Sequence, residues 1–115
     1  MRLLATIFAA VVAAGCADAG GAKASVTRQA VENIGRLSVG MSKDDVRAVM
    51  GDPARAQAAD THEAWHYCRT GSSVDEFAVV IFKDSKVTEA RHYSATTADE
   101  GAVGDCSLFF HPVAF

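Results

Sequence analysis

The sequence has no excess of basic residues, and this absence limits the classes of partner that the protein can bind. It carries 11 Lys and Arg against 14 Asp and Glu, which gives a formal net charge of −3. A nucleic-acid-binding domain needs a concentrated basic patch, so the composition argues against nucleic acid as a partner. Half of the residues are hydrophobic and 22% are charged, which argues against disorder along the whole chain.

Motifs that carry enzyme chemistry are also missing. The chain has no Gly-x-Ser-x-Gly nucleophile elbow, no Gly-rich phosphate loop and no carboxylate pair in a predicted cleft. Ser42 beside Asp44 and Asp45 is better explained by helix capping than by a nucleophile with its base. The candidate metal ligands are four histidines, His62, His66, His92 and His111. His66 and His92 are expected on neighbouring strands, but a third ligand is missing unless the cysteines stay reduced. We therefore predict no enzyme activity, no cofactor and no metal site.

The longest apolar run is too short for a membrane-spanning helix. It extends over the 12 residues from Leu3 to Ala14, behind the single positive charge of Arg2. A spanning helix needs about 20 residues, whereas the apolar core of a signal peptide needs about 7–15. We therefore interpret residues 1–15 as a signal peptide; the alternative is an ordinary N-terminal helix. The remaining residues suffice for one hydrophobic core but not for two domains.

The end of this leader predicts a lipid anchor. Ala13-Ala14-Gly15-Cys16 resembles the bacterial lipobox, and the resemblance implies cleavage before Cys16 and acylation of that cysteine. Ala17 replaces the aspartate that retains enterobacterial lipoproteins in the inner membrane, so the same resemblance implies the periplasmic face of the outer membrane. The alternative is cleavage after Ala19, at an Ala-x-Ala site, which would release a soluble periplasmic protein. Residues 16–25 are predicted to be a flexible tether, and residues 26–115 the folded domain.

Two helices are predicted at the start of this domain. The first is expected to begin with Thr27 as its N-cap, to turn Val31 and Ile34 toward the core, and to end at Gly35. In the second, Ser42 caps the N-terminus and Asp45 completes a capping box. Its apolar stripe consists of Val46, Val49 and Met50, and its C-terminal stop signals are Gly51 and Pro53.

Three strands are predicted after the helices. The strand at residues 62–69 alternates, so that Trp65 and Tyr67 lie on the face opposite to His66 and Cys68. Two further strands follow through polar turns, at residues 76–82 and 87–93. The predicted fold class is α+β, with two short helices packed on one face of a three-stranded antiparallel sheet.

The C-terminal segment adds a cysteine and three aromatic residues. With Cys16 acylated, Cys68 and Cys106 form an even pair in an oxidising compartment, and we predict a disulfide between them. Chain entropy gives this disulfide a stabilising effect of at most about 4 kcal/mol; the alternative is two free buried cysteines. Pro112 predicts that the segment lies along an edge of the domain. The candidate partner contacts are Phe109, Phe110 and Phe115, which are hard to bury in a domain of this size.

Four short sequence motifs resemble those of a known protein family. They are Gly40-Met41-Ser42, Gly51-Asp52-Pro53, Trp65-His66-Tyr67 and the strand end with its turn, Phe82-Lys83-Asp84-Ser85-Lys86-Val87. Over residues 35–92 the chain resembles the SmpA/OmlA (BamE-like) family of small outer-membrane lipoproteins. It departs from that family in lacking an upstream motif rich in tyrosine, and in carrying Cys68 and a cysteine-bearing C-terminal extension.

The resemblance implies a function without catalysis. We expect the protein to act as an accessory in outer-membrane protein assembly or envelope integrity, through contact with an envelope protein. The outer-membrane assembly machinery is among the candidate partners. Membrane association is expected through the lipid anchor alone. The alternative is a periplasmic binding or inhibitor module, because two helices on a small sheet also occur in proteinaceous inhibitors.

Overall fold

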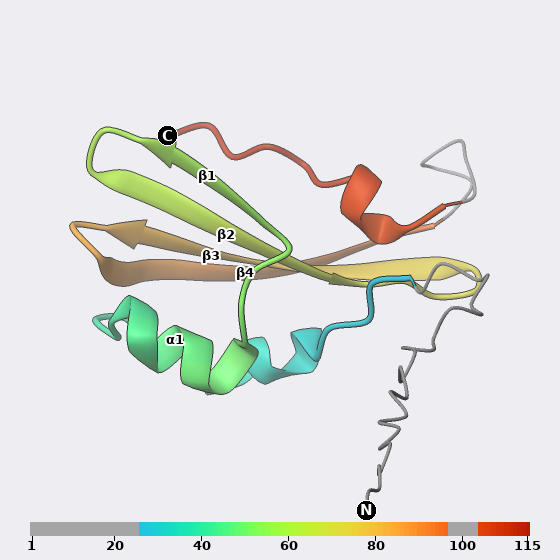
Figure 1. Ribbon diagram of the computed structural model, residues 1–115, viewed down its shortest axis with the longest axis horizontal. Helices are drawn as coiled ribbons and strands as arrows, with labels where there is room; N and C mark the ends of the chain where they lie inside the picture. Colours follow the sequence, from blue (N-terminus) through green and yellow to red (C-terminus); the bar gives the residue numbers. More distant parts are fainter. Residues whose placement is uncertain (1–25, 97–103) are drawn as a thin grey trace, which may run out of the picture.

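The computed structural model describes residues 26–96 and 104–115 (Figure 1). The predicted signal peptide, Cys16 and the predicted tether lie outside these residues. The described part is an α+β fold around one antiparallel sheet with strand order β1-β2-β3-β4. The strands are β1 (Arg55–Ala59), β2 (His62–Arg69), β3 (Val74–Lys83) and β4 (Lys86–Thr96). No helix in the described ranges has the length and apolar character needed to cross a membrane.

Helix α1 (Lys43–Met50) confirms the predicted capping signals. The backbone N–H of Asp45 donates to the Ser42 hydroxyl at 3.1 Å, and the Ser42 N–H donates to the Asp45 carboxylate at 3.2 Å. The helix ends at Gly51, whose φ of +83° is a conformation that side chains disfavour. Val46 and Met50 are buried on the face that the helix turns to the sheet.

The core lies mainly between this helix and the sheet, as Figure 1 shows with α1 below the strands. Trp65 and Tyr67 of β2 point to the helix side, which confirms the predicted alternation. The Trp65 ring meets the Phe82 ring edge-on, with centroids 4.8 Å apart. The other buried residues of this cluster are Val31, Val46, Met50, Ala78, Val80 and Val87.

The predicted first helix is wrong in type and in its start. The structure has a short 3-10 helix, η2 (Val31–Arg36), which Ala30 precedes without a side-chain cap, and Gly35 lies inside it. Thr27 is extended because the chain pairs with the end of β2. The Thr70 N–H donates to the Thr27 carbonyl at 2.8 Å, and the Gln29 N–H donates to the Cys68 carbonyl at 2.9 Å. These backbone bonds outweigh the local preference of Thr27 for a helix N-cap.

The sheet has four strands rather than the predicted three. The additional strand β1 has the sequence Arg-Ala-Gln-Ala-Ala, which contains none of the β-branched or aromatic residues that identify strands. It pairs with β2 from Arg55 opposite His66 to Ala59 opposite His62. The hairpin between β3 and β4 turns at Asp84 and Ser85, both at positive φ, as expected of a two-residue hairpin loop.

The C-terminal segment does not lie along an edge of the sheet. It crosses the sheet face opposite α1, where Figure 1 shows it above β1 and β2. Phe110 packs with Cys68 and Phe77 on that face, and Val113 packs with a second apolar cluster. The absence of a hydrogen-bonding N–H at Pro112 excludes a strand, but it does not prevent the segment from covering a face. The sheet is therefore covered on both sides.

Candidate partner-contact surface

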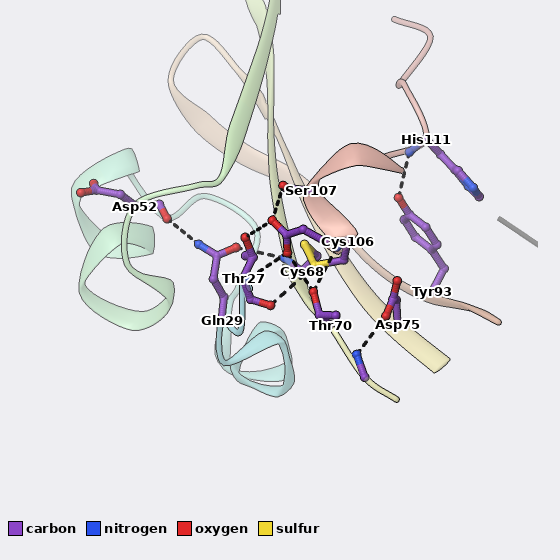
Figure 2. The surroundings of a disulfide bond; sticks show 12 residues. Thr27, Gln29, Asp52, Cys68, Thr70, Asp75, Tyr93, Cys106, Ser107 and His111 are labelled. Carbon is purple, nitrogen blue, oxygen red and sulfur yellow. Dashed lines mark hydrogen bonds between the residues drawn. A yellow bond between two sulfur atoms is a disulfide. The ribbon is translucent and has the colours of Figure 1, made fainter. Parts of the chain in front are cut away.

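The C-terminal segment is attached to β2 through a disulfide. Cys106 opens a short 3-10 helix, η3 (Cys106–Leu108), and is joined to Cys68 with the two Cα atoms 6.1 Å apart. Both cysteines are fully buried. Figure 2 shows the disulfide between the strand and η3, with polar side chains on its flank. The segment is thereby fixed at its first residues.

Asp105 connects three distant parts of the chain at this point. Its carboxylate accepts hydrogen bonds from the Thr27 N–H at 2.7 Å and from the Thr27, Thr70 and Ser107 hydroxyls at 2.8, 2.9 and 2.6 Å. Partial burial by itself raises the pKa of Asp105, but the hydrogen bonds from Ser107, Thr27 and Thr70 dominate and lower it to about 2. Asp105 is therefore ionised at neutral pH and stabilises the junction.

The three candidate phenylalanines differ in exposure. Phe110 is buried against Phe77 and the disulfide, so it is not exposed for contact with a partner in this structure. Phe109 is half-buried against the same cluster. Phe115 is 48% exposed, with its ring 5.7 Å from that of His62. Leu108, which sequence reasoning did not single out, is 72% exposed. The exposed large hydrophobic side chains of the segment are thus Leu108 and Phe115.

Two further contacts hold the segment beyond the disulfide. The Tyr93 hydroxyl accepts a hydrogen bond from the His111 N–H at 3.1 Å, and the two rings stack with centroids 4.7 Å apart. The side-chain amide of Gln57, on β1, forms two hydrogen bonds with Val113. Its oxygen accepts from the Val113 N–H at 3.0 Å, and its nitrogen donates to the Val113 carbonyl at 3.5 Å. No local pattern indicates this role for Gln57, because its partner is 56 residues away.

The histidines are not arranged as a metal site. His66 and His92 lie on β2 and β4, which β3 separates. Their partners in the register are the successive β3 residues Val79 and Ala78, so the two histidines point to opposite faces. The expectation that they lie on neighbouring strands is therefore wrong. Among residues 26–96 and 104–115, no three His, Cys, Asp or Glu side chains form a metal-binding group.

On the helix side of the sheet, charged side chains surround Trp65. Its indole N–H donates to Glu63 at 2.6 Å, and Glu63 also pairs with Lys43. Burial raises the pKa of Glu63, but the hydrogen bonds from Lys43 and Trp65 lower it below the ordinary value. The Arg47 guanidinium lies 4.7 Å from the Trp65 ring centroid. These contacts fix α1 on the sheet.

Tyr67 fixes the other end of the same helix. Its hydroxyl donates to the Gly51 carbonyl at 2.8 Å, which satisfies a backbone group just beyond the last turn. Burial raises the pKa of Tyr67 far above the ordinary value, so the hydroxyl keeps its proton. The phrases Gly51-Asp52-Pro53 and Trp65-His66-Tyr67 of the sequence thus meet in space.

This meeting of motifs agrees with a comparison against protein-family models. Residues 27–91 match the model described as "Outer membrane protein assembly factor BamE domain", which covers more than half of the chain. The chain belongs to the BamE domain family. Its family is associated with the outer membrane and with the assembly of outer-membrane proteins. A comparison with curated proteins finds none that matches the chain.

The BamE match does not include the C-terminal segment. It ends at Arg91 within β4, so that η3, the disulfide partner Cys106 and Phe115 lie beyond it. The match begins at Thr27 and therefore includes the extended residues that pair with β2. The residues that cover the face of the sheet opposite α1 lie outside the match.

Proposed function

We propose that this BamE-domain protein is a lipid-anchored lipoprotein on the periplasmic face of the outer membrane. In this role it assists outer-membrane protein assembly or envelope integrity through contact with another protein and without catalysis. The observation that carries the proposal is the match of residues 27–91 to an assembly-factor domain. The lipobox-like sequence ending at Cys16 supports the anchor independently, because it lies outside the matched residues.

The structure is consistent with a contact role. Its large side chains are used mainly in packing on both faces of the sheet, and the half-buried carboxylates of Asp105 and Glu63 are tied into structural hydrogen bonds. Aromatic and large aliphatic side chains that remain exposed are the usual anchors of a protein interface. Leu108 and Phe115, on the disulfide-fixed segment, are the side chains that we assign to partner contact.

The anchor is tested with Cys16→Ser. Since acyl chains on Cys16 supply the membrane affinity, the variant is expected to lose incorporation of a palmitate analogue and to move from the membrane to the soluble periplasmic fraction. Circular dichroism should show an unchanged fold. A variant that still sediments with membranes after a high-salt wash would contradict lipid anchoring.

The contact surface is tested by cross-linking in intact envelopes followed by mass spectrometry. Phe115→Ser and Leu108→Ser are expected to reduce cross-links to a component of the outer-membrane assembly machinery. Val39→Ser is the matched control, because Val39 is 76% exposed but lies in the loop before α1. If the Val39 variant lost the cross-link while the Phe115 and Leu108 variants retained it, the contact would lie on the helix side of the sheet instead. Cross-linking to a soluble periplasmic enzyme instead would favour the inhibitor alternative.

A further inference from the structure

His66 is a buried histidine whose protonation state is fixed by its neighbours. It is 1% exposed, and its Nε2 lies 2.5 Å from Oε1 of Gln57. The same Oε1 accepts from the Val113 N–H, while the amide nitrogen of Gln57 faces the Val113 carbonyl. Gln57 therefore presents an acceptor to His66, and Nε2 must be the nitrogen that carries the proton. Nδ1 is left unprotonated, and no described residue forms a hydrogen bond with it.

A second proton on His66, at Nδ1, has no acceptor among the side chains that the structure describes. The imidazole borders a cavity of about 30 Å³, whose other lining residues are Arg55, Gln57, Phe110 and Pro112. This volume admits about one water molecule, and the lining contains no carboxylate. A second N–H would make the imidazole positively charged beside the Phe110 ring, and the two ring centroids are 5.1 Å apart.

The charges around His66 also oppose its protonation. Arg55 on β1 is directly opposite it, and Val79 on β3 is apolar. The β4 residue opposite Val79 is Arg91, which pairs with Glu89 on the same face at 2.8 Å, so Arg55 is the cation that acts on His66. Burial and the positive charge of Arg55 both lower the pKa of His66.

We propose that residues 109–115 form a strap that is closed over the sheet while His66 is neutral and opens when its imidazole takes up a second proton. Opening admits water to Nδ1 and separates the imidazolium from its apolar cover. The groups that press on His66 from this side, Phe110 and Pro112, both belong to the strap. The strap, rather than the sheet, is therefore the element that moves.

The disulfide limits the extent of this movement. Cys106 remains bonded to Cys68, and Asp105 remains in its hydrogen-bonded junction, so the chain up to η3 stays in place. The strap is held by the Gln57–Val113 pair, the His111–Tyr93 hydrogen bond and the packing of Phe110. Opening uncovers apolar side chains of the sheet, namely Ala64, Val79 and Ile81. The strap is thus a hinged cover that acid releases reversibly.

Hydrogen exchange of the full chain tests this proposal. Amide exchange of a peptide covering 109–115 is measured by mass spectrometry at pH 7.5 and pH 5.0 and divided by the intrinsic rates. If the pKa of His66 is the ordinary 6.5 while the strap is open and lower while it is closed, lowering the pH from 7.5 to 5.0 raises the opening constant by at most about 30-fold. The expected result is a several-fold or greater loss of protection in the strap, while β3 keeps its protection.

Two substitutions separate His66 from the other titratable groups. His66→Gln keeps a side-chain donor toward Gln57 without titrating, and His66→Phe keeps a ring against Phe110; each is expected to abolish the pH dependence. His111→Gln is the control for the other histidine of the strap: it removes the ring that stacks on Tyr93 and so raises the opening constant at both pH values, but it should leave the pH dependence in place. Persistence of the full dependence in either His66 variant, or its loss in the His111 variant, would overturn the proposal.

A measurement on the unaltered protein covers the case in which both His66 variants fail to fold. The imidazole of His66 is titrated by NMR together with the backbone signals of the strap. Coincident midpoints below pH 6.5 support the mechanism. A strap that responds at a different pH from His66, or does not respond, refutes it.

Discussion

Replacing Asp105 by Asn is expected to destabilise the fold by about 2 kcal/mol at neutral pH. The pKa of Asp105 falls from 3.8 to about 2 on folding, and this difference of somewhat under two units corresponds to about 2 kcal/mol. The figure is an upper value, because the carboxylate is only partly buried and water screens part of its interactions. Asn is nearly isosteric with Asp but carries no charge, and its amide group turns a donor toward the hydroxyls of Thr27 and Thr70.

The pH dependence of this effect has a definite sign. The folded-state pKa of Asp105 is depressed, so its contribution to stability is fully present above the unfolded value of 3.8. The contribution is lost as the pH falls from 3.8 through about 2, because the folded carboxylate is then protonated as well. The stability difference between the unaltered protein and Asp105→Asn should therefore be constant from pH 7 to pH 5 and shrink steadily below pH 4.

The assay is urea denaturation at a series of pH values, followed by the fluorescence of Trp65, the only tryptophan of the chain. Trp65 is buried in the core between α1 and the sheet and reports on global unfolding. Asp44→Asn serves as the control, because the side chain of Asp44 is 97% exposed and its replacement should change the stability by less than about 0.5 kcal/mol. A difference between the Asp105 variant and the unaltered protein that stays constant from pH 7 to pH 2 would refute the reasoning.

Two further predictions concern the disulfide and the end of α1. Alkylation of the denatured but unreduced domain should find both buried cysteines blocked, and reduction should lower the free energy of unfolding by at most about 4 kcal/mol, measured by urea denaturation with and without dithiothreitol; two alkylatable thiols would contradict this. Gly51→Ala should lower the stability by about 1–3 kcal/mol, because a φ of +83° strains any side chain although no atom lies within 4 Å of the added Cβ. Gly35→Ala, which has the same open space at negative φ, should change little, and equal effects of the two substitutions would argue against strain as the cause.

The parts of the fold that could be predicted from the sequence are those determined by local signals. Ser42 with Asp45, followed by Gly51 and Pro53, specifies the start and end of α1 within a few residues of chain. The alternation of Trp65 and Tyr67 in β2 identifies the face that α1 covers, because the period of a strand is two. Family membership could be recognised for the same reason, since its motifs are these local signals.

The parts that could not be predicted depend on residues far apart in the sequence. β1 is a strand because β2 pairs with it, and its alanine-rich sequence carries little strand preference of its own. Thr27 has the character of a helix N-cap, but its hydroxyl donates to Asp105, 78 residues away. The burial of Phe110 follows from the sheet face that receives it, which no local pattern describes. The sequence around Asp105 contains one local signal, because Ser107 follows two positions later. A serine at this spacing indicates a local turn in which its hydroxyl donates to the Asp105 carboxylate.

The pairing of residues 27–29 with the end of β2 determines how the domain responds to a pull from its N-terminal side. Thr27 lies at the start of the described fold, and its backbone and hydroxyl are bonded to Thr70 and Asp105. Tension along the axis of β2 loads these bonds together with the Gln29–Cys68 bond, in shear and not one after another. The disulfide at Cys68 lies directly behind them. The N-terminal end of the described fold is thus mechanically reinforced, and a pull on it reaches the sheet before α1.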